Sequence, residues 1–225
     1  MILEVKNLGL DRGEEVHLRN ISFSLEPCEC LVIRTPILLL GTALLETLMG
    51  LEEKVSGEVL FGGENMLDDM PSHRRLSLRR DIGYAHRVGG LVSLLNVREN
   101  IALPLCYHAK VTRGQAAFAT DEVAEATGIR ELLDREVDEL DMVQMRLVNL
   151  ARALINRPRL LLVDAILEGM KDEQRERVSS AIGYFRGECD FGVLMTTRTR
   201  DLPQTTRVLE LRPDGLCAPG NLNDA

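Results

Sequence analysis

The residues with the spacing to do chemistry begin where an apolar run meets a long apolar helix pattern, over residues 30 to 51, CLVIRTPILLLGTALLETLMGL. Cys30 to Arg34 has the character of a buried strand, and Thr35 with Pro36 suits an N-cap and first helical position. Phosphate-binding turns at such junctions read GxxxxGK followed by Ser or Thr, because glycine backbone N–H groups surround the anion and lysine neutralises it. Here those eight positions read TPILLLGT, and only Thr42 keeps its type. The junction is therefore a phosphate turn with a filled pocket, or an ordinary core strand and helix.

Composition narrows the class of protein. The 225 residues are 45% hydrophobic with a net charge of -8, which suits one domain or two joined subdomains and opposes general binding to nucleic acid. Five scattered cysteines predict reduced thiols in a cytoplasmic protein. The longest apolar stretch, Pro36 to Leu51, contains Glu46 and is shorter than the roughly 20 residues that span a bilayer. We therefore expect any membrane association to come through a partner.

Periodicity and turn residues predict a chain in which strands alternate with helices. Alternating or continuous apolar runs predict strands, and capping residues before 3.6-residue periods predict helices. Asn96 with Glu99 predicts a helix that Pro104 ends, whereas Thr112 with Gln115 predicts one that ends at Gly128. The predicted strands are 2–8, 17–25, 30–34, 57–61, 81–85, 159–163, 191–197 and 207–211, and the predicted helices are 36–51, 72–80, 96–103, 112–128, 130–135, 142–156 and 172–186. This order implies an α/β fold with a mostly parallel sheet and an antiparallel edge.

The order of elements resembles the ATPase subunit of ATP-binding cassette (ABC) transporters over essentially the whole chain. NLARALINRPRLLLVD (149–164) resembles that family's Walker B helix and strand, RVLELRPDG (207–215) its terminal hairpin, and GEVLFGGENM (57–66) the strand after its phosphate turn. The resemblance implies a P-loop NTPase-like fold in one ABC ATPase-like domain, residues 1–225. Its α/β core with an antiparallel β subdomain would be 1–86 and 156–225, and its helical subdomain 87–155. Residues 89–105 are most similar to the Mce-type and Mla-type lipid-transport ATPases.

The family's working motifs fall on altered residues. Arg12 stands where an aromatic residue stacks on adenine, the signature LSGGQ reads LDMVQ over 140–144, and Ala165 replaces the general-base glutamate. Asp141 puts a carboxylate at the helix N-terminus that would meet a phosphate, and so repels it. The resemblance leaves as vestigial nucleotide-site positions Gly41, Thr42, Arg87 (for glutamine), Gln144, Asp164 (the retained Walker B aspartate) and Arg198 (for the switch histidine).

Phosphoryl transfer depends on positioning and charge neutralisation, so these losses together predict a pseudo-ATPase with no catalytic residues, cofactor or metal. Asp164 would then be neutralised by Arg198 or Arg87. Some of the side chains of Ile37 to Leu40 would replace the nucleotide, either by filling their own pocket or by packing across a dimer interface against Met142 and Val143. In the alternative, all four face their own core.

The resemblance implies a structural or docking subunit of a membrane transport complex, with lipid of the Mce or Mla type as its cargo. Its expected partners are an integral membrane permease, bound through residues 87–105 at the inner face of the membrane, a second cassette in a homodimer or heterodimer, and an Mce-domain protein, but no nucleic acid. Two alternatives stay open. One is a divergent ATP-binding subunit that pairs with an intact ATPase paralogue, and the other is a soluble regulatory pseudo-ATPase.

Overall fold

The computed structural model describes residues 1–13, 16–108, 111–188, 190–198, 205–212 and 215–218. The chain forms two compact units, one of Met1–Arg79 with Gly192–Ala225 and the other of Arg80–Phe191. Their boundaries lie at 79/80 and 191/192, whereas the predicted helical subdomain begins at 87 and ends at 155. That residues 87–155 form the family's helical subdomain, and residues 1–86 and 156–225 its core, remains a prediction.

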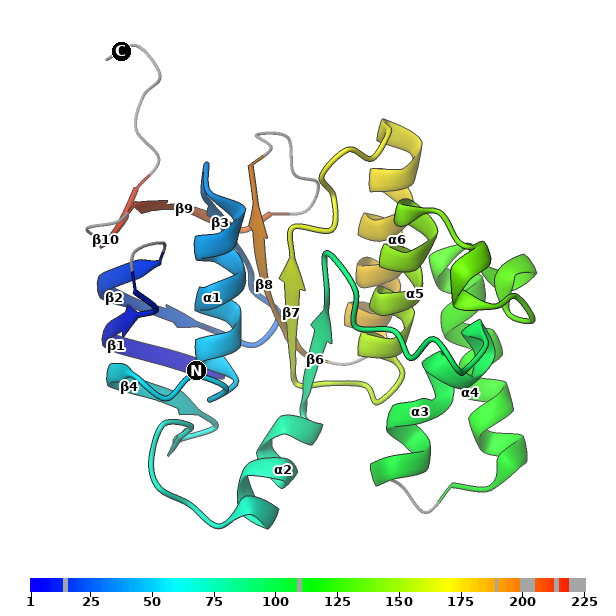
Figure 1. Ribbon diagram of the computed structural model, residues 1–225, viewed down its shortest axis with the longest axis horizontal. Coiled ribbons are helices and arrows are strands. Elements are labelled where there is room, and N and C mark those ends of the chain that lie inside the picture. The colour runs from blue at the N-terminus through cyan, green and yellow to red at the C-terminus, as the bar shows by residue number, and fades with distance from the viewer. Residues whose placement is uncertain (14–15, 109–110, 189, 199–204, 213–214, 219–225) are drawn as a thin grey trace. The chain divides into compact units, whose positions relative to one another are not determined.

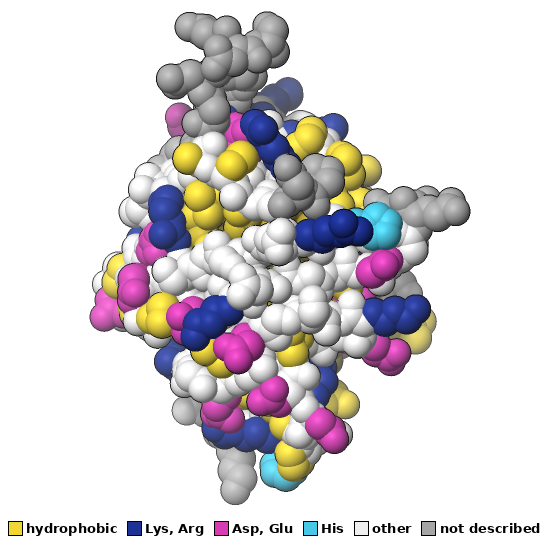
Figure 2. Space-filling view, turned by 90° about the vertical axis from the view of Figure 1, so that its left-hand side faces the viewer, with side chains coloured by type: hydrophobic (Ala, Val, Ile, Leu, Met, Phe, Trp, Pro, Cys, Tyr) yellow, Lys and Arg dark blue, Asp and Glu magenta, His cyan; other side chains and the backbone are white. Residues whose placement is uncertain are grey.

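An antiparallel sheet opens the first unit, with the strand order β2-β1-β4-β5 (Figure 1). Its strands are β1 (Leu3–Asp11), β2 (His17–Leu25), β4 (Val55–Phe61) and β5 (Glu64–Asn65). Gly57, with φ +91, lies so close to β1 that an added Cβ would meet the carbonyl oxygens of Lys6 and Asn7 at 2.5 Å. Only glycine fits that crossing, and the register between β1 and β4 shifts beside it. Figure 2 shows that the surface on this side mixes acidic and basic side chains.

Parallel strands form the other sheet of this unit. β3 (Cys30–Arg34) pairs in parallel with both β8 (Gly192–Thr197) and β9 (Arg207–Arg212), and β10 (Gly215–Cys217) continues antiparallel to β9. The predicted hairpin turn at 213–214 lies outside the described residues. All of β8 is buried, as expected for a strand covered on both faces. α1 (Leu38–Leu48) packs against β8, and α2 (Ser72–Arg80) is a separate short helix.

The second unit joins a parallel strand pair to four helices (Figure 1). β6 (Ile82–Ala85) pairs with β7 (Leu160–Asp164), and α5 (Met142–Leu154) packs against β6. α3 (Val97–His108) and α4 (Arg113–Thr127) pack on α5, and α4 also packs on α6 (Asp172–Glu188). Short 3-10 turns, Arg130–Leu132 and Val137–Glu139, connect α4 to α5. The predicted α/β fold with its parallel strands and antiparallel edge is confirmed.

The predicted helix over 130–135 is only a 3-10 turn, Arg130–Leu132, and two predicted boundaries of longer helices are wrong. α1 begins at Leu38 with Ile37 as its N-cap, because Thr35 uses its hydroxyl in a turn with Ile37 and caps nothing. α3 continues through Pro104 to His108. An internal proline costs about 3 kcal/mol, and the burial of Ile101 and Leu105 on α3 offsets it. Among the described residues, no helix is long and apolar enough to cross a membrane.

Candidate functional site

The junction between β3 and α1 uses its polar groups internally. The backbone N–H of Thr35 donates to the Thr197 carbonyl at 2.9 Å, and that of Leu40 donates to the Ile37 carbonyl at 3.0 Å. The N–H of Ile37 donates to the Thr35 hydroxyl at 3.3 Å. A phosphate cradle needs several N–H groups aimed at one point outside the chain. In residues 35–42, three of these N–H groups are instead bonded within the chain.

Gly41 serves packing in this structure. A Cβ built on Gly41 would lie 3.0 Å from the Cβ of Thr196, so the missing side chain lets α1 approach β8 closely. The Thr42 hydroxyl donates to the Leu38 carbonyl at 3.2 Å, one turn back along α1. A side chain at position 41 would require Thr196 of β8 to shift by a few tenths of an ångström.

The four apolar residues before Gly41 divide between core and surface. Leu40 is buried with 3% exposure, whereas Ile37 and Leu39 are 48% and 39% exposed. Leu38 is half-buried. The alternative in which all four face their own core is therefore wrong. Packing across a dimer interface stays a prediction.

Arg12, at the position expected for an adenine-stacking residue, is held by two carboxylates. Its guanidinium donates to Glu52 and to Glu46 of α1. The pKa of Arg12 is raised above its ordinary value, first by the hydrogen bond to Glu52 and also by Glu46, against the effect of burial. The side chain thus ties the end of β1 to the first helix.

In the second unit the predicted Asp164 ends β7 and is only 3% exposed. Among the described residues, one cation that interacts electrostatically with Asp164 is Arg146 of α5, which sequence reasoning missed. Burial and the nearby Arg87 lower the pKa of Arg146, while the charges of Glu168 and Asp164 raise it. The sequence could have indicated this role for Arg146, because helical spacing places it on the buried face of α5 with Asn149 and Leu150.

Arg146 bonds to both loops that follow β6 and β7. Its Nε donates to the Arg87 carbonyl at 3.1 Å, and its Nη1 donates to the carbonyls of Ile166, at 3.4 Å, and Glu168. Ala165, which stands where a general base was sought, is fully buried with φ +44. Arg87 contacts Arg146 through its backbone carbonyl oxygen. Arg198 is exposed and belongs to the other unit, so its predicted pairing with Asp164 stays a prediction.

The N-terminus of α5 is capped as its sequence indicates. Gln144 donates its backbone N–H to the Asp141 carboxylate at 2.8 Å, and its side-chain oxygen accepts from the Asp141 N–H at 2.9 Å. This capping box satisfies two helix donors locally. Met142 is 60% exposed and Val143 is half-buried.

Side chains of α3 and α5 form hydrogen bonds with the backbone of the loop from Arg87 to Leu95. Asn100, fully buried on α3, bonds through its side chain to both backbone groups of Val92 and to the carbonyls of Leu95 and Asn96. Asn149 and Arg152 of α5 donate to the carbonyls of Gly89 and Gly90, at 2.9 and 2.5 Å.

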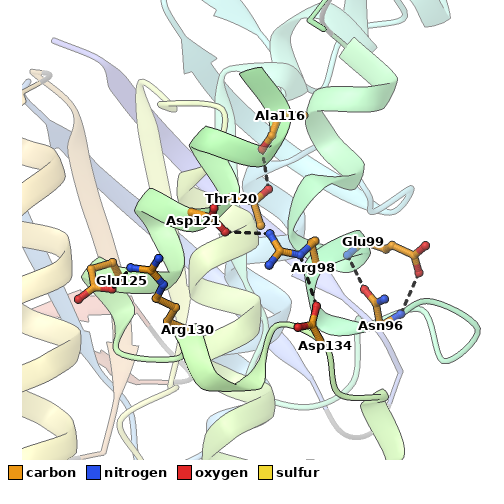
Figure 3. Close-up of polar contacts among 9 residues, drawn as sticks. All are labelled: Asn96, Arg98, Glu99, Ala116, Thr120, Asp121, Glu125, Arg130 and Asp134. Carbon is orange, nitrogen blue, oxygen red and sulfur yellow. Dashed lines mark hydrogen bonds and ion pairs between the residues drawn. The ribbon is translucent and has the colours of Figure 1, made fainter. Parts of the chain in front are cut away.

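The start of α3 is fixed as well. Asn96 and Glu99 form the predicted capping pair (Figure 3). Arg98 reaches Asp121 of α4 at 2.8 Å and Asp134 at 3.6 Å. The loop from Arg87 to Leu95 exposes three apolar side chains, Val88 at 65%, Val92 at 39% and Leu94 at 91%. An apolar surface on a fixed backbone is typical of a docking site.

Parallel strands joined to helices fit the fold of an ABC cassette. The ABC transporter family model matches residues 18–167, and the chain belongs to this family. It is 31% identical over 199 residues to the molybdate/tungstate import ATP-binding protein WtpC of Thermococcus kodakarensis, covering 88% of this chain and 58% of that protein. It is 32% identical over 177 residues to the spermidine/putrescine import ATP-binding protein PotA of Chromobacterium violaceum, covering 79% and 47%. The chain thus spans about half the length of the curated relatives it matches.

Solved structures show the same fold. The dimeric bacterial ABC transporter cassette MJ0796 matches with a TM-score of 0.86 at 21% identity, over 96% of both chains. CbiO1 of Clostridium perfringens, part of the transporter complex cbiONQ, matches with a TM-score of 0.79 at 21% identity, over 98% of this chain and 88% of that one.

The comparisons correct one prediction. The chain was expected to be a pseudo-ATPase, and this is wrong, because the curated relatives that match most of it are ATP-binding proteins of importers. Residues 35–42 lack the lysine and the glycines of a phosphate turn, so they do not fit a polyphosphate by themselves. The expected closeness to the Mce-type and Mla-type ATPases remains a prediction, because the relatives named here import other cargoes.

Proposed function

We propose that this chain is the cassette subunit of an ATP-driven membrane import complex. In that complex it binds an integral membrane permease through residues 87–105 and pairs with a second cassette subunit, in a homodimer or a heterodimer. Membership of the ABC transporter family supports the class, and the import ATP-binding relatives support the direction of transport.

The observation that carries this proposal is the rigid, exposed apolar loop. Leu94 is 91% exposed although Asn100, Asn149 and Arg152 hold the surrounding backbone. Burying one such side chain contributes about 1.5–3 kcal/mol, and a pre-ordered loop loses little entropy on binding. A permease helix laid on Val88, Val92 and Leu94 would therefore be held by this surface.

ATP turnover is proposed for the assembled complex. The relatives are named as ATP-binding proteins, whereas residues 35–42 of this chain lack the lysine and the glycine-rich turn. A heterodimer with an intact cassette would supply those groups, which supports the alternative of a divergent subunit working with an ATPase paralogue. The complex should hydrolyse ATP at a rate that falls at least tenfold when the partner's phosphate-turn lysine is replaced.

The proposed cargo is a lipid. Residues 89–105 resemble lipid-transport ATPases of the Mce and Mla type, and this favours a lipid cargo and an Mce-domain partner. The curated relatives are named for molybdate or tungstate and for polyamines, so their names point to other cargoes. Uptake assays with labelled lipid, molybdate and spermidine would separate these cargoes.

The docking proposal is tested by co-expressing the tagged chain with a candidate membrane permease. Leu94→Ser should abolish co-purification of the permease while the chain keeps its urea midpoint. Leu76→Ser on α2, at 54% exposure, is the matched control and should co-purify like the parent. Undiminished recovery of the permease with Leu94→Ser would contradict docking through this loop.

A further inference from the structure

A groove of about 640 Å³ runs between α4 and α6, wholly within the second unit. Phe118, Asp121 and Glu125 line it from α4, Ser180 and Tyr184 line it from α6, and Arg130 also lines it. We call it the α4–α6 groove. It contains no residue of the 87–105 loop, so its occupant is a separate question from permease docking.

The α4 wall of this groove is one stripe of the helix. Phe118, Asp121, Glu122 and Glu125 are spaced i, i+3, i+4 and i+7, which places them on one face. Phe118 is 75% exposed, and Tyr184 across the groove is 48% exposed. Two aromatic rings left in water beside carboxylates are unusual on a free surface and typical of a binding site.

The carboxylates of the groove offer hydrogen-bond acceptors to an occupant. Asp121, Glu122 and Glu125 line it together with Arg130, and each carboxylate already pairs with one arginine of the chain. Asp121 accepts from Arg98 at 2.8 Å and Glu125 accepts from Arg130 at 3.2 Å (Figure 3). These bonds fix the two carboxylates, whose side chains stay 45% and 68% exposed and keep further acceptor positions. A cation therefore meets ordered acceptors here.

The chain already uses this combination once, where Arg157 meets one residue of each of the same two helices. The guanidinium of Arg157 lies 4.5 Å from the centroid of the Phe185 ring and donates to Glu122 at 2.6 Å. An arginine held between an aromatic face and a carboxylate is a favourable pairing, because the ring attracts the cation while the carboxylate binds its N–H groups. Phe118 and Tyr184 with Asp121 and Glu125 offer the same pair of groups to the outside.

We propose that the α4–α6 groove binds an arginine-bearing, partly apolar segment of a protein partner. The arginine pairs with Asp121 and Glu125, and its apolar neighbours cover Phe118 and Tyr184. A protein segment suits the groove better than a lone small cation, because most of the lining surface is apolar and the volume exceeds one guanidinium group several-fold. This inference stands independently of the proposed transport function.

The test uses three defined probes against the whole chain. They are an acetylated, amidated amphipathic peptide of leucines with two arginines four residues apart, the same peptide with glutamates in place of arginines, and spermine. Binding is followed by calorimetry and by amide chemical shifts. The arginine peptide should shift amides of 113–130 and 177–185, and Phe118→Ser or Glu125→Arg should weaken it at least about tenfold. Met142→Ser, exposed in the same unit, is the matched control and should change nothing.

The charge swap is the decisive arm. Glu125→Arg should gain measurable affinity for the glutamate peptide, which the parent chain does not bind. Far-UV circular dichroism checks that Phe118→Ser and Glu125→Arg keep the fold. Equal binding of both peptides by the parent, shifts outside α4 and α6, or spermine binding as tightly as the arginine peptide would each overturn the proposal.

Discussion

Replacement of Arg146 should loosen the loops after β6 and β7 before it unfolds the chain. Arg146 is 6% exposed, and its guanidinium serves the carbonyls of Arg87, Ile166 and Glu168. Arg146→Met leaves these acceptors without their donor. A buried acceptor that loses its partner costs about 1–3 kcal/mol.

The magnitude follows from where the three carbonyls lie. Ile166 is fully buried, so its carbonyl cannot turn to water and the full cost applies. Arg87 and Glu168 are half-buried, so water recovers part of the loss. We expect Arg146→Met to lower the free energy of unfolding by about 2–4 kcal/mol. Arg146→Lys keeps the charge beside Asp164 but loses the planar fork, and should cost about 1–2 kcal/mol.

Urea denaturation followed by circular dichroism measures the free energy of unfolding, and hydrogen exchange locates the loosening. Amides of 165–170 and 86–90 should exchange faster in Arg146→Met than in the parent, while those of β8 keep their protection. Arg130→Met, 66% exposed at the side chain, is the control and should stay within about 0.5 kcal/mol. An Arg146→Met variant as stable as this control would refute the reasoning.

Two further predictions concern the docking loop and its neighbour. Asn100→Ala should cost about 2–4 kcal/mol and speed hydrogen exchange over 92–96, because its buried side chain alone supplies three donated bonds and one accepted bond to that backbone; unchanged exchange there would contradict this. Burial, with a smaller effect from Arg152, lowers the pKa of His86 from 6.5 to about 4, so the folded chain binds fewer protons than the unfolded chain between those values. Stability is therefore full above pH 6.5 and falls as the pH drops, by about 1–2 kcal/mol between pH 7 and pH 5, and His86→Gln should flatten this part of the profile in denaturation experiments at several pH values.

Local patterns in the sequence predicted most of the secondary structure. The capping pairs at the starts of α3 and α4 are as the residues predict, because a cap joins groups three positions apart. The buried strands β3 and β7 lie where their continuous apolar runs place them. The family resemblance rested on the same local segments, and the family model confirms it.

Tertiary contacts decided what lies around the candidate site. Arg146 meets the Arg87 carbonyl 59 positions away and the Ile166 carbonyl 20 positions away, and no spacing rule indicates either contact. α3 continues past Pro104 because packing outweighs a local penalty, and Gly41 lets α1 approach β8. Residue types at motif positions predicted a chain without enzymatic function, and its relatives overturned that. A motif records the chemistry of a few side chains, whereas the surfaces that α3 and α4 present depend on how the whole unit packs, and only the folded chain shows them.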